Sequence, residues 1–122
     1  MLIEDDLDDQ EIFYMALNDV DPTIECTIID NCTEAIEKLK SDISLTPDYI
    51  FIDANMPKLN GLQCLEIINN INHLQGSKII LYSTYFIQEI IVQGKNLGVN
   101  EFIVKNTLYF CFMILFSYSG DL

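Results

Sequence analysis

Five polar residues follow short apolar stretches of the chain, and their types suit the joint binding of a cation and an oxyanion. They are Glu4, Asp5, Asp53, Ser83 and Lys105. Carboxylates that approach one another cannot all stay ionised without a cation, so an acidic cluster either raises a pKa or binds a metal, for which Mg²⁺ is the best match. A lysine and a hydroxyl beside that ion would bind the oxygens of an anion. The set therefore favours phosphoryl chemistry.

The nucleophile for such chemistry would be a carboxylate. The set contains no histidine or cysteine, so the product would be an aspartyl phosphate. Asp6 is left out of the set, because it stands where a helix is expected to begin and an Asp at that position satisfies free backbone N–H groups.

These residues can act together only if the fold brings the ends of several strands to one place. Short apolar or β-rich runs predict strands over residues 1–3, 24–29, 49–52, 78–82 and 101–104. Between these runs, apolar residues recur at helical spacing over residues 8–19, 35–39, 62–71 and 86–97. Right-handed crossovers fold such a βα alternation into a doubly wound α/β parallel sheet with helices on both faces. Ligands in such sheets bind beyond the carboxyl ends of the strands, so we expect the five residues in one cleft.

The composition is that of a compact, strongly acidic protein. The chain has 122 residues, 50% of them hydrophobic, and a formal net charge of −13 from 6 Lys+Arg and 19 Asp+Glu. This length and apolar content predict a single domain over residues 1–122. The negative charge disfavours direct contact with nucleic acid or an anionic membrane, because both require lysine and arginine to displace counterions.

The chain carries no recognisable signal for export or membrane insertion. Its start, MLIEDDLDD, lacks the basic and apolar regions of a secretory signal, and the longest apolar run, residues 108–116, is far shorter than the roughly 20 residues of a spanning helix. The cysteines contain no C-x-x-C pair; they are Cys26, Cys32, Cys64 and Cys111. We therefore expect a cytoplasmic protein whose cysteines are buried thiols without a disulfide.

The residues singled out above resemble the receiver domain of two-component response regulators. The segment from Asp53 to Gly61 (DANMPKLNG), the early acidic pair, a serine 30 positions after Asp53 and a lysine 22 positions after that serine all match the family's pattern. The resemblance covers residues 1 to about 106. It implies the flavodoxin-like form of the fold, a five-stranded parallel sheet with strand order 2-1-3-4-5.

The resemblance implies that Asp53 accepts a phosphoryl group from a phosphohistidine of a sensor histidine kinase or a phosphotransfer protein. Mg²⁺ would be the cofactor. Asp5, Asp53 and the backbone carbonyl of Asn55 would bind it directly, and Glu4 would act through a water. Apart from taking up and losing its own phosphoryl group, the protein would not be an enzyme.

The resemblance also implies a switch. Ser83 would move its hydroxyl onto the phosphoryl oxygens, Lys105 would pair with them, and Phe102 matches the aromatic whose rotamer reports the phosphorylated state. The responding surface would be built by the fourth helix, the fifth strand and the fifth helix. It would bind a downstream protein target, and it is a candidate interface for a homodimer.

Two other functions stay open beside this one. A Mg²⁺-dependent aspartyl-phosphate phosphohydrolase also uses an Asp at a strand end, but it needs a second acid two residues later as general acid, where this chain has Asn55. A receiver-like module with a degenerate site would bind its partners constitutively. The presence of Asp5, Asp53 and Lys105 argues against that alternative.

Two features depart from the family's pattern. The family usually has a proline after the lysine, joined through a cis bond, where this chain has Asn106. The C-terminal segment, residues 107–122, lacks the charge pattern of a surface helix. We expect this atypical segment to be either a partner surface or an irregularly packed end.

Overall fold

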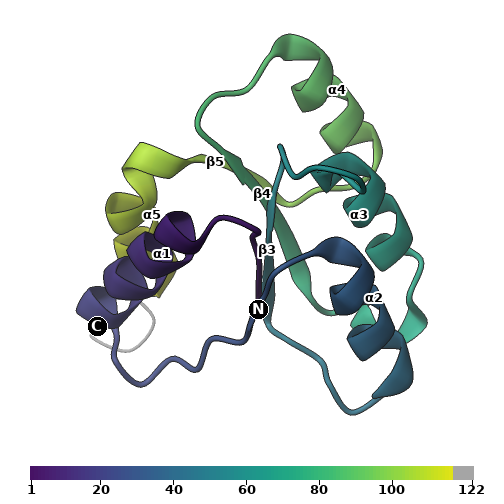
Figure 1. Ribbon diagram of the computed structural model, residues 1–122, viewed down its shortest axis with the longest axis horizontal. Helices are drawn as coiled ribbons and strands as arrows, with labels where there is room; N and C mark the ends of the chain where they lie inside the picture. Colours follow the sequence, from purple (N-terminus) through teal and green to yellow (C-terminus); the bar gives the residue numbers. More distant parts are fainter. Residues whose placement is uncertain (117–122) are drawn as a thin grey trace.

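Five parallel strands form one sheet through the middle of the molecule (Figure 1). The computed structural model describes residues 1–116, without the side chain of Phe110. The strands are β1 (Leu2–Ile3), β2 (Ile28–Ile29), β3 (Tyr49–Asp53), β4 (Lys78–Ser83) and β5 (Glu101–Val104). Their order across the sheet, β2-β1-β3-β4-β5, confirms the predicted topology.

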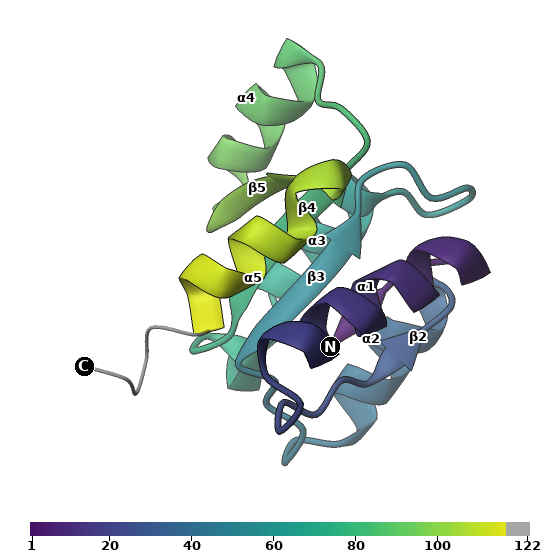
Figure 2. The same cartoon turned by 90° about the vertical axis from the view of Figure 1, so that its left-hand side faces the viewer.

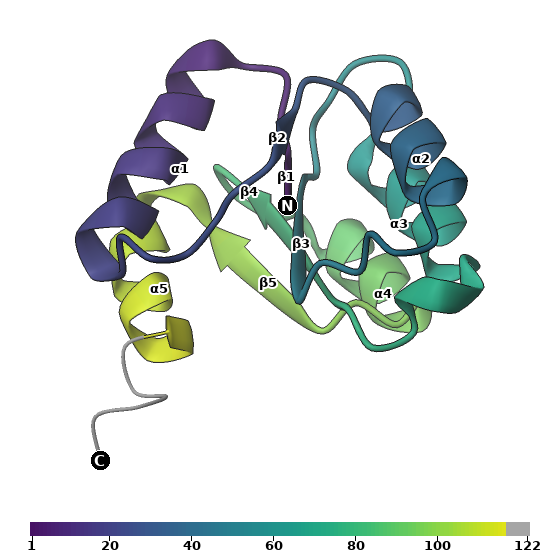
Figure 3. The same ribbon diagram turned by 90° about the horizontal axis from the view of Figure 1, so that it is seen from below.

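Helices cover both faces of this sheet, as predicted. One face is covered by α1 (Leu7–Val20) and α5 (Leu108–Phe116), which lie side by side in front of the strands in Figure 2. The other face is covered by α2 (Cys32–Ser41), α3 (Gly61–Asn69) and α4 (Gln88–Asn96), and Figure 3 shows the two layers of helices on either side of the strands. Two short 3-10 turns, η1 (Asn72–Leu74) and η2 (Lys105–Thr107), complete the chain order.

The strands are apolar on both sides because both faces of the sheet are covered. In β3, Ile50 and Ile52 pack in the cluster that includes α2 and α3, whereas Phe51 packs in the cluster that includes α1 and α5. All three side chains are at most 3% exposed. Alternation between two apolar layers explains why the sequence of this strand is a continuous apolar run.

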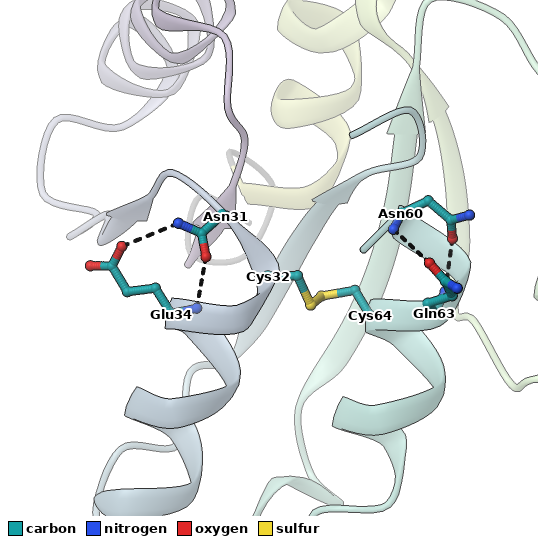
Figure 4. The surroundings of a disulfide bond; sticks show 6 residues. All are labelled: Asn31, Cys32, Glu34, Asn60, Gln63 and Cys64. Atoms are coloured by element: carbon teal, nitrogen blue, oxygen red, sulfur yellow. Dashed lines mark hydrogen bonds between the residues drawn. A yellow bond between two sulfur atoms is a disulfide. The ribbon is translucent and has the colours of Figure 1, made fainter. Parts of the chain in front are cut away.

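Side-chain caps start three of the helices directly after the loops that follow the strands. Asp6 accepts a hydrogen bond from the backbone N–H of Asp9 and begins α1, so its interpretation as a helix cap is confirmed. Asn31 caps α2 by accepting from the backbone N–H of Glu34. Asn60 and Gln63 form a reciprocal capping box at the start of α3 (Figure 4).

Most predicted elements differ from the structure by one to three residues at their ends, and the second strand differs most. Of the second strand expected over residues 24–29, only Ile28 and Ile29 pair in the sheet. The reason is that its neighbour β1 offers only Leu2 and Ile3 as partners. The fourth helix begins at Gln88, two residues later than its apolar spacing predicts.

The expectation that the cysteines are all free thiols is wrong. Cys32 and Cys64 form a disulfide, with their Cα atoms 5.9 Å apart (Figure 4). Cys32 is the first residue of α2 and Cys64 lies in the first turn of α3, and these helices pack against each other on the same face of the sheet. The sequence separation of 32 residues gives no sign of the bond, because the fold alone brings the two helix starts together. Cys26 and Cys111 are free.

The atypical C-terminal segment is helical as far as Phe116, and residues 117–122 lie outside the described part of the chain. Leu108 and Phe112 are buried against the α1 side of the core, whereas Tyr109 and Ile114 are about half exposed, at 51% and 52%. Among residues 1–116, no helix has the length and apolar character needed to cross a bilayer.

Candidate functional site

The carboxyl ends of four strands bring acidic and basic side chains to one edge of the sheet. Glu4 follows β1, and its backbone N–H still bonds to the carbonyl of Ile29 in the neighbouring strand. Asp53 and Ser83 are the last residues of β3 and β4, and Lys105 comes directly after β5. These ends are level with one another because the parallel register pairs Asp53 with Tyr82 and Ser83 with Val104.

Three carboxylates form the centre of this site. One oxygen from each of Glu4, Asp5 and Asp53 lies within 4.8 Å of the other two. Glu4 and Asp53 are buried, at 0% and 4% exposure, whereas Asp5 is exposed and forms the solvent side of the cluster.

Lys105 points its ammonium group into the same cluster. Its Nζ lies 3.0 Å from Glu4 Oε1 and 3.3 Å from Asp53 Oδ2. The shortest of its contacts, 2.7 Å, is to Oδ2 of Asp9 on α1. The lysine thus reaches the site although Asn106 follows it, and no cis peptide bond occurs among the described residues.

Glu4 has hydrogen-bond donors on both of its carboxylate oxygens. The hydroxyl of Tyr82, a residue with no exposed surface, donates to Glu4 Oε1, the same oxygen that Lys105 approaches. The backbone N–H of Asp6 donates to Glu4 Oε2 over 3.2 Å. A buried carboxylate with these three donors is satisfied where it stands.

Ser83 and Asn55 link the end of β4 to the loop after β3. The side-chain amide of Asn55 donates to Ser83 Oγ over 2.6 Å, and its backbone N–H donates to Asp53 Oδ1 over 3.0 Å. Ser83 is fully buried. One residue therefore ties the hydroxyl and the central carboxylate into the same hydrogen-bonded unit.

The loop after Asp53 is held close to the start of α3 by a glycine. A Cβ on Gly61 would lie 2.6 Å from the Cα of Ala54 and 2.7 Å from the carbonyl oxygen of Asp53. Only a residue without a side chain permits this approach. Lys58, in the same loop, has a positive φ of 63°.

The pKa values of the site reflect burial and crowding of negative charge. Burial, followed by the neighbouring Asp53, raises the pKa of Glu4, and burial, followed by the neighbouring Glu4, raises the pKa of Asp5. Burial alone would lower the pKa of Lys105, but its bonds to Asp9 and Glu4 and the charge of Asp53 outweigh burial and raise it. Both carboxyl pKa values are therefore raised first by burial and second by a neighbouring carboxylate.

The donor set suits a hard divalent cation. Carboxylate oxygens are the ligands that Mg²⁺ prefers, and the exposed Asp5 leaves a path from solvent to the cluster. Burial raises the pKa of Glu4 and Asp5 most, and a cation there would offset the second cause, the negative charge of the neighbouring carboxylate. The residues present therefore fit such an ion.

Phe102 is the one predicted site residue that lies away from this cluster. It sits in β5 on the side of α4, partly buried, with its ring 5.3 Å from the ring of Phe86 in an edge-to-face arrangement. A Cβ on Gly94 of α4 would lie 2.8 Å from its ring. The aromatic therefore packs against Phe86, in the loop before α4, and against Gly94, near the C-terminal end of α4.

Three participants were not found from the sequence. Tyr82 has a weak signal, a polar tip at the end of an otherwise aliphatic strand, KIILY. Asp9 has one too, since it lies in the first turn of the helix that follows the acidic loop. The side chain of Asn55 was missed because only its backbone carbonyl was expected to contribute.

Comparisons with known proteins identify a family that the chain resembles over most of its length. A family model described as the response regulator receiver domain matches residues 1–108. The chemotaxis protein CheY of Thermotoga maritima is 30% identical over 102 residues, which cover 81% of this chain and 81% of that protein.

Solved structures of response regulators share the fold. The phosphorylated cyanobacterial phytochrome response regulator RcpA superposes with a TM-score of 0.83 at 24% identity, covering 99% of this chain and 94% of that one. A two-component response regulator from Legionella pneumophila gives a TM-score of 0.86 at 18% identity, covering 96% and 93%. These two likenesses extend over nearly the whole sheet and its helices.

Proposed function

Because the chain belongs to the response regulator receiver domain family, we propose that Asp53 accepts a phosphoryl group in a Mg²⁺-dependent reaction and thereby switches a protein-binding surface. Receiver domains interact with histidine kinases or phosphotransfer proteins, and one of these would be the donor. The observation that carries the proposal is the position of Asp53, whose carboxylate lies among Glu4, Asp5 and Lys105 at the strand ends.

The transfer is a displacement at phosphorus. A carboxylate oxygen of Asp53 forms the new O–P bond while the P–N bond to the donor histidine breaks, and the imidazole nitrogen takes a proton from solvent as it leaves. Lys105 stands 3.3 Å from Asp53 Oδ2, where it would pair with the arriving phosphoryl oxygens. The N–H of Asn55 orients the other oxygen of Asp53.

Asp5, Asp53 and the backbone carbonyl of Asn55 would hold the Mg²⁺. Glu4 would act through a water, because Tyr82, Lys105 and the N–H of Asp6 already occupy its carboxylate. The ion would neutralise negative charge on the phosphoryl oxygens.

Ser83 and Phe102 would carry the signal outward. The Ser83 hydroxyl would leave Asn55 to bond to the phosphoryl oxygens, and the space it vacates would let the Phe102 ring change rotamer. The surface of α4, β5 and α5 would then bind a downstream protein, or a second copy of the chain.

The setting that we propose is a single receiver domain over residues 1–122 in the cytoplasm. Its net charge of −13 argues against direct contact with nucleic acid or an anionic membrane. The Cys32–Cys64 disulfide is unusual for that compartment. Both cysteines are at most 2% exposed, so reductants would reach the bond mainly through local opening.

The test is the intact mass of the wild type and of Asp53→Asn after incubation with acetyl phosphate and Mg²⁺. We expect the wild type alone to gain the mass of one phosphoryl group. Steady release of phosphate with many turnovers would instead indicate the phosphohydrolase, although position 55 offers an amide in place of its general acid. No mass gain at all would leave the constitutive binding module.

A further inference from the structure

Lys105 is bound most closely by a residue outside the family's pattern. Its Nζ lies 2.7 Å from Asp9 Oδ2, 3.0 Å from Glu4 Oε1 and 3.3 Å from Asp53 Oδ2. An ammonium group has three protons to donate. These three carboxylates therefore use all of its hydrogen-bonding capacity. Without a phosphoryl group, the contact from Lys105 to Asp53 is the longest of the three.

Lys105 lies over the buried ring of Tyr82. The Lys105 ammonium lies 4.9 Å from the centre of the Tyr82 ring, and the hydroxyl of that ring binds Glu4 Oε1. Tyr82 is fully buried and its ring packs edge-to-face against Phe13 of α1. Glu4 and Tyr82 therefore hold the lysine in place. The side chain of Asp9 is 34% exposed, so its ion pair with Lys105 is the one that can break most easily.

The residue after the lysine is not the proline that the family usually has, so contacts with side chains hold Lys105 in position. Lys105 begins the 3-10 turn η2 and is followed by Asn106. A lysine side chain is long and loses conformational entropy when it is held in one place, so several fixed partners are needed to hold it.

We infer that Asp9 is a positioning residue that competes with Asp53 for Lys105 and gives the lysine up when Asp53 carries a phosphoryl group. This inference rests on the proposed function. A phosphoryl group on Asp53 brings additional negative charge and strong acceptor oxygens close to the lysine, which already lies 3.3 Å from Asp53 Oδ2. The ion pair with Asp9 is the contact that breaks, because a partly exposed ion pair contributes little free energy.

The test compares Asp9→Asn with Asp8→Asn. Both variants remove one negative charge from the first turn of α1, but Asp8 is exposed and no contact joins it to Lys105 among the described residues. With low concentrations of acetyl phosphate and Mg²⁺, we expect Asp9→Asn to be phosphorylated about threefold faster than Asp8→Asn, the change that losing a partly exposed competing ion pair allows. Equal rates in the two variants, or a slower Asp9→Asn, would overturn the inference.

The NMR signal of the Lys105 ammonium nitrogen gives a readout that a purely structural role would not move. Phosphorylation should shift this signal in the wild type and in Asp8→Asn, and shift it less in Asp9→Asn, where the competing partner is already gone. The same shift in all three proteins would contradict the exchange of partners. If the wild type takes up no phosphoryl group, the proposed function fails; the resting signal still reports whether Asp9, and not Asp8, binds the lysine.

Discussion

Glu4 shows how much the site depends on single donors. Its carboxylate has no exposed surface and relies on Tyr82, Lys105 and one backbone N–H. Burial removes water from a carboxylate, and hydrogen-bond donors compensate for that loss. When one donor is removed, the folded state becomes less stable. Tyr82 therefore stabilises the fold as well as orienting the site.

Tyr82→Phe should lower the free energy of unfolding by about 1–3 kcal/mol, because it removes the hydroxyl and leaves the buried Glu4 oxygen short of a donor. Urea denaturation at neutral pH measures the change. Tyr85→Phe is the matched control, since Tyr85 is 70% exposed and should lose less than about 0.5 kcal/mol. Equal losses in the two variants would show that the Tyr82 hydroxyl does not support Glu4.

Gly61 sets the path of the loop that carries Asn55. Gly61→Ala should cost roughly 1–3 kcal/mol of stability, because the new Cβ would meet the backbone of Ala54 and Asp53 at 2.6 and 2.7 Å and backbone atoms cannot turn aside. Thermal unfolding of the variant tests this. Gly76→Ala serves as the control, because a Cβ there has no atom within 4 Å. A Gly61→Ala protein as stable as Gly76→Ala would refute the close approach.

Among the elements, α2 and α3 are joined in a way that the sequence did not disclose. The strands and most helix positions follow from local patterns, such as the apolar run of β3 and the cap at Asn31. The Cys32–Cys64 bond depends on two helix starts that meet only in the folded chain. The length of β2 likewise depends on the length of its partner β1. The β-rich sequence of residues 24–29 carries no information about that partner.

Breaking the disulfide should lower the free energy of unfolding by about 3–4 kcal/mol, the loop-closure value for cysteines 32 positions apart. Cys32→Ser with Cys64→Ser, compared with the oxidised wild type in urea, measures it. Cys111→Ser is the control, since Cys111 is free. Reductant should destabilise the wild type and leave the double variant unchanged; an insensitive wild type would argue that the bond does not form.

At the scale of the whole molecule, acidic charge gathers where the strands end. Glu4, Asp9 and Asp53 contact Lys105 there, and Asp5 lies beside Glu4 and Asp53, in a chain whose net charge is already −13. The convergence of Asp5, Asp53 and Lys105 could be expected from the strand-end rule. The contributions of Asp9 and Tyr82 have only weak sequence signals, because their contacts to Lys105 and Glu4 form only when α1 and the strand ends meet in the folded chain.

Mg²⁺ should stabilise the protein beyond its effect on ionic strength, because binding to the folded state alone adds stability. The expected gain is about 1.4 kcal/mol when the ion is present at roughly ten times its dissociation constant. Thermal unfolding in Mg²⁺ or in NaCl of equal ionic strength measures it. Asp5→Asn should lose the gain, whereas Asp19→Asn, which changes an exposed acid at the far end of α1, should keep it. A gain that persists in Asp5→Asn would place the ion elsewhere.

The most direct test of the account is to locate the phosphoryl group itself. After treatment with acetyl phosphate and Mg²⁺, borohydride reduces an aspartyl phosphate to an alcohol that peptide mass spectrometry can map. We predict modification at Asp53 alone, and only when Mg²⁺ is present. Modification at another acid of the cluster, such as Asp5 or Asp9, or none at any of them, would contradict the central claim.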